Sequence, residues 1–329
     1  MHDNGLIIGK FMPLHKGHLA LVDFARQHCH KLTIALCFTE EEPIPGKTRE
    51  QWLRETYSGE PGIEIACFPY SENELPNTSV SSREVSMRWG QELSKRFPHT
   101  DIVFSSEPYG DYLAEYMGTA HLCFDRERST QPVSGTMIRQ APLSYWDYLA
   151  DAAKPYYVRK VVILGTESTG KSTLAIRLAN HFQTSYVPEM ARYIIEKTAF
   201  CRYEHLLEIA ELHAKTIGEQ LPRANKLLFI DTDLAITRSY ARFLFNRELQ
   251  PLPDWIIRNN HADLSLFLTA DCEFIQDGTR LDAVDRMKLN ISHLEELKRE
   301  ERDYRLISGN WDTRFHTSCE MIQMHFFNP

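Results

Sequence analysis

The amino-acid sequence predicts an α/β protein with two doubly wound parallel-sheet domains, residues 1–150 and residues 151–329. Its 329 residues are about twice the length of a typical domain. Short, nearly continuous apolar runs alternate with longer helical stretches, which is typical of a parallel sheet covered by helices on both faces. The alternation occurs twice, with a break near residue 150.

The first series contains five expected strands, each a short apolar run. These strands are residues 5–9, 31–38, 62–68, 101–105 and 120–124. Helices are expected around residues 17–29, 48–57, 80–96 and 108–117. Parallel strands end at the same edge of a sheet, and open α/β sheets bind ligands at that edge. Residues that follow the strands are therefore the first candidates for a site.

A domain boundary is expected within residues 141–158, which are rich in aromatic side chains and contain Pro142 and Pro155. This segment fits neither series, and its aromatic side chains indicate that it packs on one of the domains. The second series begins with RKVVILG at residue 159. It continues with a helix from residue 171 and with strands at 226–231, 263–269 and 303–308.

The composition excludes several classes of protein. Lys and Arg number 37 against 45 Asp and Glu, a formal charge of -8, whereas a general nucleic-acid binder is usually basic. No apolar run approaches the ~20 residues that span a bilayer, and the N-terminus has no signal-peptide pattern. The seven cysteines are scattered without a C-x-x-C pair, which is typical of reduced thiols. We expect a cytoplasmic protein without nucleic-acid or membrane partners.

The turn after the first strand, GKFMPLHKGH at residues 9–18, combines glycines with two histidines. Glycines let backbone N–H groups approach a phosphate, and a helix that begins near Gly17 adds its positive end. His15 and His18 can both face the turn and donate hydrogen bonds to a phosphoryl group as charge develops on it. An isolated H-x-x-H would rather indicate capping histidines or a metal pair. The surrounding strand and glycines favour nucleotide binding, by Gly9, Lys10, Phe11 and Gly17.

A second element, VSGTMIRQ at residues 133–140, follows the fifth strand. Ser134 or Thr136 can cap a helix whose first turn presents N–H groups and Arg139 to a triphosphate. Alone, this pattern would indicate no more than a capped helix. At the end of a strand in the same sheet as the H-x-G-H turn, it becomes specific.

The two elements together resemble the nucleotidyltransferase superfamily with H-x-G-H and I-S-x-T-x-x-R signatures, with Val133 in place of the usual isoleucine. Members have a doubly wound, Rossmann-like fold and transfer a nucleotidyl group from a nucleoside triphosphate without a covalent enzyme intermediate. The resemblance implies that His15 and His18 stabilise the α-phosphate and the leaving pyrophosphate. It also implies that Thr136 and Arg139 bind the triphosphate.

The second domain opens with a complete G-x-x-x-x-G-K-[ST] element, GTESTGKST at residues 165–173, between a strand and a helix. Its backbone N–H groups can wrap a β-phosphate, Lys171 can reach the β- and γ-oxygens, and the Ser172 hydroxyl can bind Mg²⁺. This pattern predicts a P-loop kinase that uses ATP and Mg²⁺. The residues expected to bind nucleotide here, besides Lys171, are Gly165, Thr166, Glu167, Ser168, Thr169, Gly170, Ser172 and Thr173.

Two carboxylates, Asp231 and Asp233, follow the strand at 226–231. Asp231 suits a water-bound Mg²⁺ or a substrate hydroxyl, and either carboxylate is a candidate base for a hydroxyl nucleophile. One of the two can instead cap the next helix, and the sequence leaves open which one does.

For other charged residues of this domain, both a binding role and a purely structural role are possible. Glu189 and Arg192 follow a short strand, where they either bind the phosphoryl acceptor or begin a surface helix. Arg280 and Arg286 either belong to a lid that closes over the γ-phosphate or are solvated charges.

A nucleotidyltransferase followed directly by a P-loop kinase is similar to the NadR family of bifunctional nicotinamide-mononucleotide adenylyltransferases and ribosylnicotinamide kinases. The similarity covers nearly the whole chain, and its most specific segments are VSGTMIRQAPLSYWDYL, ILGTESTGKSTL, VPEMARYI and IDTDLAITRSY. The family implies that the C-terminal domain phosphorylates the 5′-hydroxyl of nicotinamide riboside with ATP. The N-terminal domain would then join the mononucleotide to AMP, which gives NAD and pyrophosphate. Because the chain starts at the first strand, we expect it to lack the helix-turn-helix domain of some members.

Several positions are weaker candidates for binding in the N-terminal domain. Trp89 either stacks on the nicotinamide ring or is a half-buried helix residue. Arg49 follows the second strand and is a candidate for a phosphate contact. Ser106, Glu107 and Tyr109 follow the fourth strand, at the ligand-binding edge. The partners expected overall are the small molecules ATP, nicotinamide riboside and nicotinamide mononucleotide, and the oligomeric state is not readable.

Two alternatives remain open. The chain can be a transferase–kinase fusion of a different vitamin pathway, which the generic motifs do not exclude. It can also be a regulator that senses nucleotides without turnover. The intact His15, His18, Lys171 and Ser172 argue against the second alternative.

Overall fold

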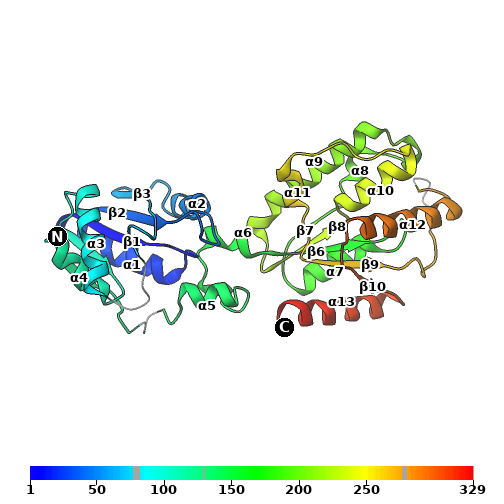
Figure 1. The fold of residues 1–329 in the computed structure, drawn as a ribbon. Helices are drawn as coiled ribbons and strands as arrows, with labels where there is room; N and C mark the ends of the chain where they lie inside the picture. Colours follow the sequence, from blue (N-terminus) through cyan, green and yellow to red (C-terminus); the bar gives the residue numbers. More distant parts are fainter. Residues whose placement is uncertain (77–81, 128, 130, 276–279, 329) are drawn as a thin grey trace. The chain divides into compact units, whose positions relative to one another are not determined.

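The computed structural model describes residues 1–76, 82–127, 129, 131–275 and 280–328. The chain divides into two compact units, Met1–Tyr156 and Tyr157–Pro329, each built around its own parallel sheet (Figure 1). The sequence predicts a boundary at residue 150. The observed division lies a few residues later, within the short helix α6 (Lys154–Tyr157).

The first unit has a five-stranded parallel sheet in the order β3-β2-β1-β4-β5. The strands are β1 (His2–Gly9), β2 (Cys29–Phe38), β3 (Ile63–Pro69), β4 (Ile102–Ser105) and β5 (Ala120–Cys123). The chain builds the sheet outward from β1 to β3 and then returns to add β4 on the other side of β1. In open α/β sheets, ligands usually bind at such a reversal of strand order, which lies here at the carboxyl ends of β1 and β4.

The helices of this unit connect the strands and cover the sheet. They are α1 (Lys16–Arg26), α2 (Gly46–Thr56), α3 (Arg83–Arg96), α4 (Tyr109–Met117) and α5 (Gly135–Gln140). Helix α1 contacts β2 and β4, whereas α3 and α4 pack against each other over Phe68 and Val103. The doubly wound α/β architecture predicted from the sequence is therefore confirmed.

The segment 141–158 forms short helical turns in place of strands or long helices. They are η1 (Trp146–Tyr148), η2 (Asp151–Ala153) and α6. Trp146 and Leu149 are buried, and the Ala150 N–H donates to the Leu14 carbonyl beside the H-x-G-H turn. This part of the segment thus packs on the first unit and stabilises the turn that carries the H-x-G-H motif.

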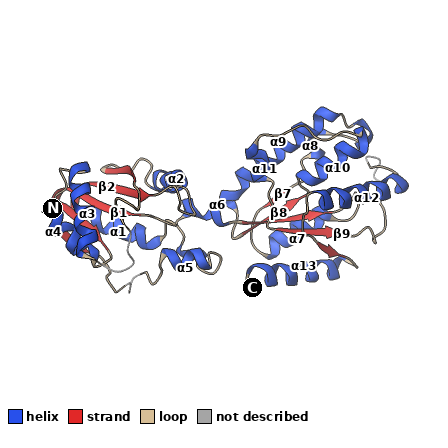
Figure 2. Ribbon diagram, in the orientation of Figure 1, coloured by secondary structure: helices blue, strands red, loops and turns tan. Residues whose placement is uncertain are grey.

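The second unit has a five-stranded parallel sheet in the order β10-β9-β6-β8-β7. Figure 2 shows strands of this sheet in red, with helices in blue on both sides. Its strands are β6 (Arg159–Leu164), β7 (Tyr186–Val187), β8 (Leu227–Asp231), β9 (Leu264–Leu268) and β10 (Arg305–Ile307). Its longer helices are α7 (Lys171–His181), α9 (Tyr203–Gln220), α10 (Leu234–Phe245), α12 (Ala283–Arg299) and α13 (Trp311–Phe326). The shorter ones are α8 (Ala191–Ile194), η3 (Thr198–Phe200), η4 (Leu221–Arg223) and α11 (Asp254–Asn259).

The core of the second unit lies between the sheet and the helices α7 and α13. Val161, Phe229 and Leu266 from three neighbouring strands meet Leu178 of α7 and Ile322 of α13, and all five side chains are fully buried. Helix α13 is therefore part of the core and lies close to α7, the helix that follows the P-loop.

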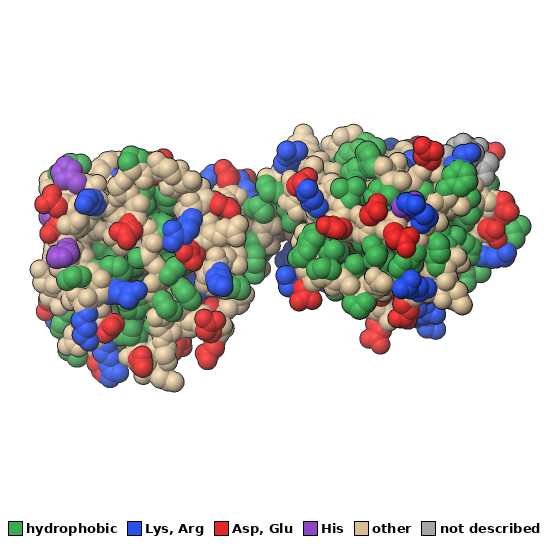
Figure 3. Space-filling view, turned by 90° about the horizontal axis from the view of Figure 1, so that it is seen from above, with side chains coloured by type: hydrophobic (Ala, Val, Ile, Leu, Met, Phe, Trp, Pro, Cys, Tyr) green, Lys and Arg blue, Asp and Glu red, His purple; other side chains and the backbone are tan. Residues whose placement is uncertain are grey.

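Charged side chains of both signs are interspersed on the surface of each unit seen in Figure 3. None of the described helices has the length and apolar character needed to cross a membrane. All seven cysteines are free thiols.

Candidate active sites

The H-x-G-H turn holds its two histidines together at the start of a helix. His15 is the N-cap of α1, where its Nδ1 accepts a hydrogen bond from the Gly17 N–H at 3.1 Å. The Nδ1 atom of His18 accepts from the His15 N–H at 3.3 Å. The two rings stack with their centroids 3.7 Å apart. Both imidazoles thus lie at the positive end of α1, a position that suits contact with a phosphate.

Other residues of the turn have defined structural roles. Phe11 is buried with a φ of +46° and packs against His18, with 4.9 Å between the ring centroids. Gly9 ends β1, and a Cβ there would lie 3.2 Å from the Phe11 ring. Gly17 is similarly tight, because a Cβ would lie 3.0 Å from the His15 ring. A side chain at either position would therefore have to displace one of these rings by a few tenths of an ångström.

The structure brings the second motif of this unit to the same turn. Ser134 caps α5 by accepting from the Met137 N–H at 3.2 Å. Arg139 of this helix donates through Nη1 to the Met12 carbonyl at 2.5 Å and through Nη2 to the Thr136 hydroxyl at 3.1 Å. The two signatures are far apart in the sequence, and these contacts join them in one site.

A chain of hydrogen bonds organises the loop after β4. His121 Nε2 lies 3.0 Å from Ser105 Oγ, and His121 Nδ1 lies 2.8 Å from Asp111 Oδ1. Although this order of groups matches a hydrolytic triad, Ser105 is buried and its hydroxyl donates to the Glu107 carbonyl at 3.0 Å. These hydrogen bonds instead fix the loop that contains the candidate residues Ser106, Glu107 and Tyr109. The Tyr109 hydroxyl donates to the Ile8 carbonyl at 3.4 Å.

The side chain of Arg49 is completely buried, and its expected phosphate contact stays a prediction. Its guanidinium donates to the Lys10 carbonyl at 2.8 Å and pairs with Glu42 at 2.5 Å. Glu42 also pairs with Lys10 at 2.7 Å. Burial alone would raise the pKa of Glu42, but hydrogen bonds from Lys10 and Arg49 outweigh it and lower that pKa. Arg49 therefore stabilises the H-x-G-H turn through its hydrogen bond to the Lys10 carbonyl.

Trp89 occupies the half-buried helix position that was the alternative to stacking on a ligand. Its ring packs against Phe68 and Tyr70, with centroid distances of 5.8 and 4.9 Å. Its indole N–H donates to the Pro76 carbonyl at 3.2 Å. These contacts assign it a packing role in the first unit.

The P-loop of the second unit connects β6 to α7 in the expected strand–loop–helix context. Gly165, Ser168 and Gly170 have φ angles of +137°, +57° and +84°, which turn successive backbone N–H groups inward. The Lys171 ammonium donates to the Thr166 carbonyl at 3.1 Å, and the Thr169 hydroxyl donates to the same carbonyl at 2.8 Å. The loop thus has the geometry of a phosphate-binding nest.

Two buried arginines on helices outside the P-loop donate hydrogen bonds to its carbonyl groups. The sequence motif predicts neither contact. Arg286 of α12 donates through Nε to the Glu167 carbonyl at 2.8 Å, and Arg314 of α13 donates to the Thr169 carbonyl at 2.7 Å. Because Arg286 is buried against the loop, it is not a solvated charge, and its contact with the γ-phosphate stays a prediction. Arg280 lines the pocket beside the P-loop, and the preceding residues 276–279 lie outside the described part of the chain.

The structure separates the roles of the two aspartates. Asp233 caps α10 by accepting from the N–H groups of Ala235 and Ile236 at 2.9 and 3.3 Å, and it also pairs with Arg302. Its carboxylate therefore has the helix-capping role that the sequence left open. Asp231 accepts from the Ser172 hydroxyl at 2.5 Å through Oδ2. Its other oxygen, Oδ1, is buried without a hydrogen-bond partner among the described residues.

The surroundings of Asp231 favour its protonated form. Burial and the nearby Glu189 carboxylate raise the pKa of Asp231 to about 6, against the attraction of Lys171. A buried carboxylate oxygen without a described partner, next to a serine hydroxyl, is the oxygen-rich environment that Mg²⁺ prefers. Ser172 and Asp231 therefore fit the predicted metal position.

A pocket of about 380 Å³ adjoins the P-loop. Glu167, Ser168 and Lys171 line one side of it, and residues of α8, α9 and α10 line much of the rest. Glu189 and Arg192 also line it, with Arg192 donating to Glu189 at 3.0 Å and to the Ser172 hydroxyl at 3.3 Å. The structure thus brings these two predicted residues to the P-loop serine.

Glu167 connects the P-loop to the walls of this pocket. Its carboxylate accepts from the Thr198 hydroxyl at 2.9 Å, from the Tyr240 hydroxyl at 3.2 Å and from the Leu281 N–H at 2.9 Å. The sequence assigned Glu167 to nucleotide binding through its position in the loop. Its side chain instead joins three separate segments around the pocket.

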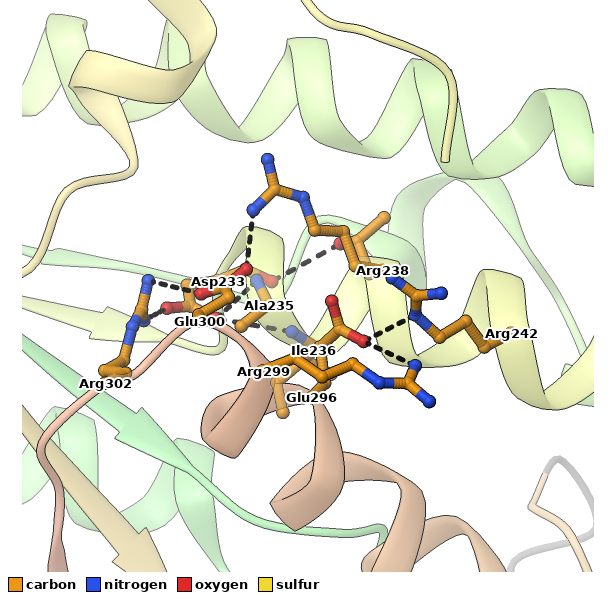
Figure 4. A network of polar contacts seen from close by, with 10 residues as sticks. Asp233, Ala235, Ile236, Arg238, Arg242, Glu296, Arg299, Glu300 and Arg302 are labelled. Carbon is orange, nitrogen blue, oxygen red and sulfur yellow. Dashed lines mark hydrogen bonds and ion pairs between the residues drawn. The ribbon is translucent and has the colours of Figure 1, made fainter. Parts of the chain in front are cut away.

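An ion-pair network between α10 and α12 holds the start of α10 in place (Figure 4). Arg242 and Arg299 flank the Glu296 carboxylate at 2.7 and 3.6 Å. Glu300 pairs with Arg238 at 2.5 Å and with Arg302 at 3.2 Å, and Arg302 reaches Asp233. Since acidic groups neutralise these arginines, the network is a structural brace rather than an anion site.

Known proteins are similar to this chain across both of its compact units. A family model described as an AAA domain matches residues 160–314. The trifunctional NAD biosynthesis/regulator protein NadR of Escherichia coli (strain K12) is 28% identical over 348 aligned residues, which cover 97% of this chain and 82% of the relative. The protein of the same description from Salmonella typhimurium (strain LT2) is 29% identical, with the same shares covered.

Two solved structures are similar to this chain along nearly its full length. A crystal structure of a NadR protein in complex with NR has a TM-score of 0.80 and 19% identity, and the match covers 99% of this chain and 97% of the other. A crystal structure of a NadR protein in complex with NAD and AMP-PNP has a TM-score of 0.79 and 18% identity, with 99% and 96% covered. At this identity, the two structures show a shared fold.

Proposed function

Because this chain is a homologue of the NadR proteins, we propose that it is a bifunctional enzyme that makes NAD in two steps, one in each compact unit. The second unit phosphorylates nicotinamide riboside with ATP. The first unit transfers the adenylyl group of a second ATP to the resulting mononucleotide, which gives NAD and pyrophosphate. The family resemblance expected from the sequence is confirmed along 97% of the chain.

The phosphorylation step uses the groups around the 380 Å³ pocket. The P-loop and Lys171 bind the β- and γ-phosphates of ATP. Asp231 accepts the proton of the 5′-hydroxyl as that oxygen attacks the γ-phosphorus and the bond to ADP breaks. Glu189 and Arg192 orient the riboside beside it.

The adenylylation step needs no strong base, because the nucleophile is already a phosphate dianion. Its oxygen attacks the α-phosphorus of ATP, and pyrophosphate leaves. The stacked imidazoles of His15 and His18, the positive end of α1 and Arg139 stabilise the negative charge that develops. Thr136 and the backbone around Gly9 complete the nucleotide site in this proposal.

Magnesium is the metal that we propose for the kinase step. Ser172 and Asp231 would hold it, since one is a hydroxyl and the other a buried carboxylate with an oxygen that lacks a described partner. When bound, the ion neutralises charge on the β- and γ-phosphates. The NadR structure with NAD and AMP-PNP supports a nucleotide site of this kind in the family.

The observation that carries the kinase assignment is the position of Asp231. Its Oδ2 atom accepts from the P-loop serine, and its Oδ1 atom has no hydrogen-bond partner among the residues that the structure describes. A pocket of about 380 Å³ adjoins the same loop. The test is to incubate the purified protein with ATP, Mg²⁺ and nicotinamide riboside. We expect the mononucleotide to appear first and NAD to follow. Turnover of another vitamin precursor, with neither of these products, would instead support a different transferase–kinase fusion.

We also propose a cytoplasmic location. The seven free cysteines support it, because thiols remain reduced in that compartment. The predicted lack of a nucleic-acid partner stays a prediction.

A further inference from the structure

Glu167 belongs to both the P-loop and the pocket of the second unit. Its backbone lies inside the loop, where its carbonyl accepts a hydrogen bond from Arg286 Nε at 2.8 Å. Its side chain lines the pocket of about 380 Å³. A ligand that fixes the loop and a ligand that fills the pocket would therefore act on the same residue.

The Glu167 carboxylate connects the loop to segments that are distant in the sequence. Its Oε1 atom accepts from the hydroxyls of Thr198 in η3 and Tyr240 in α10, at 2.9 and 3.2 Å. Its Oε2 atom accepts from the Leu281 N–H, just before α12, at 2.9 Å. The three donors lie 31, 73 and 114 positions from Glu167 along the chain. Since Thr198 and Tyr240 also line the pocket, one side chain links the P-loop to two parts of the pocket wall.

The three hydrogen bonds require an ionised carboxylate. Such a group accepts through both oxygens, whereas a glutamine has one accepting oxygen and a donating NH2 group. Burial and the nearby Glu167 raise the pKa of Tyr240, which keeps the tyrosine hydroxyl protonated as a donor. A negative charge at this position also repels a triphosphate, so nucleotide binding by itself does not favour a carboxylate here. The carboxylate instead suits the segments that it connects.

We infer that Glu167 is a positioning residue that couples the binding of ATP to the binding of the phosphoryl acceptor. This inference rests on the kinase function proposed above. When phosphates bind the backbone N–H groups of the loop, they fix the backbone of Glu167. Its carboxylate then holds Thr198 and Tyr240 in place, and the acceptor meets walls that are already ordered. Because the second binding event loses less conformational entropy, each substrate increases the affinity for the other by the same factor.

The test measures how an ATP analogue changes the affinity for the acceptor. Calorimetry with the full chain gives the Kd of nicotinamide riboside, first alone and then with saturating Mg²⁺ and AMP-PNP, which does not transfer its γ-phosphate. The ratio of the two Kd values is the coupling factor. For the wild-type protein we expect a coupling factor of at least about 5. Glu167→Gln should lower it at least about 3-fold.

Glu196→Gln is the matched control. Glu196 lines the same pocket, is exposed and forms no hydrogen bond with the described residues. Its replacement removes the same charge without breaking a link to the P-loop, so the coupling factor should keep its wild-type value. Equal losses in the two variants would overturn the inference, because the charge of the pocket would then be the cause. An unchanged coupling factor in Glu167→Gln would overturn it as well.

Two further variants remove donors and leave the carboxylate in the P-loop. Tyr240→Phe and Thr198→Val each remove one hydroxyl group, and both should lower the coupling factor. They decide the question if Glu167→Gln does not fold, since wild-type coupling factors in both would overturn the inference. Glu167→Gln and Tyr240→Phe combined should lower the factor by less than the product of the two single effects, because both changes act on the same hydrogen bond.

Turnover by the wild-type protein separates this inference from the function on which it rests. If the protein does not phosphorylate nicotinamide riboside, the proposed kinase function and the coupling through Glu167 both fail. If it phosphorylates nicotinamide riboside but has a coupling factor of about 1, only the role of Glu167 fails.

Discussion

Arg314 donates a hydrogen bond to the carbonyl of Thr169 at 2.7 Å and so connects helix α13 to the P-loop. The same guanidinium donates to the carbonyls of Gly309 at 2.8 Å and Thr269 at 3.1 Å, and it pairs with Asp271. The side chain is 1% exposed. A buried cation with four acceptors therefore fixes the outer side of the P-loop.

Replacement of Arg314 should weaken the second unit and its kinase activity together. Arg314→Leu leaves three carbonyls and a carboxylate without their donor, and breaking such a buried network costs about 3–5 kcal/mol. We expect a lower unfolding midpoint for the second unit and a kinase rate reduced at least about 10-fold. Arg177→Ala, which removes an exposed arginine paired with Asp312, is the matched control and should change little. A normal melting curve for Arg314→Leu would contradict this prediction.

The two reactions should be separable by mutation. Lys171→Ala should abolish phosphorylation of the riboside, because it removes the cation that binds the β- and γ-phosphates. It should leave adenylylation of supplied mononucleotide largely intact, and His18→Ala should do the reverse. Product formation in the two separate assays measures both effects. Loss of both activities in either variant would mean that the two units do not act independently.

The raised pKa of Asp231 makes the stability of the free protein depend on pH. The folded state holds this proton more tightly than the unfolded chain, whose pKa is 3.8, so the stabilisation is present below about pH 4 and is lost as the pH rises through about 6. Asp231→Asn should therefore stabilise the nucleotide-free, metal-free protein at about pH 8, by roughly 1–3 kcal/mol, while its kinase activity is lost. Urea unfolding at about pH 8 and about pH 4 measures the difference. An equal gain at both values would show that the charge of Asp231 is not its cause.

The buried pair of Arg49 and Glu42 should matter for the first unit. Arg49→Met removes the donor to the Lys10 carbonyl and one cation from Glu42, which should cost about 2–4 kcal/mol and slow adenylyl transfer. Because the pKa of Glu42 is lowered in the fold, the stabilisation is present above its ordinary value of 4.5 and is lost as the pH falls. The stability difference between wild type and variant should therefore shrink in acid. Arg54→Ala, on the exposed side of the same helix, is the control and should have less effect than Arg49→Met at neutral pH.

The sequence predicts those parts of the molecule that follow from local pattern. Apolar runs predict most of the strands of both sheets, and glycine-rich turns lie after β1 and β6, where we propose that phosphates bind. The boundaries differ by a few residues, since hydrogen bonding continues past the apolar positions. For example, β1 begins at His2 rather than at residue 5 because it pairs in register with Cys29 of β2.

The parts that the sequence does not predict depend on contacts between distant segments. Nothing local distinguishes Arg49, which supports a turn, from an arginine that meets a phosphate, since both follow strands at the ligand-binding edge. Likewise, Asp231 and Asp233 are close neighbours in the sequence, and only the contacts of Asp233 with Arg302 and the start of α10 assign it to a structural role.

Arg314 belongs to no motif, so sequence reasoning missed it. It is a polar residue on a helix side that faces the interior of the second unit. The signal that could have found it is therefore a polar residue on the apolar face of a predicted helix. That signal is weak by itself, because it does not say which distant group the side chain meets.

The bond between Arg314 and Thr169 also sets an order of events during synthesis. The two residues are 145 positions apart, so at about 5–20 residues per second the ribosome needs roughly 7–30 s to supply the arginine after the loop has been made. During that interval the first sheet of the nascent chain is complete, but the Thr169 carbonyl of the P-loop has no arginine that donates to it. The proposed ATP site of the second unit is therefore completed late in translation, well after the proposed site of the first unit has all of its residues.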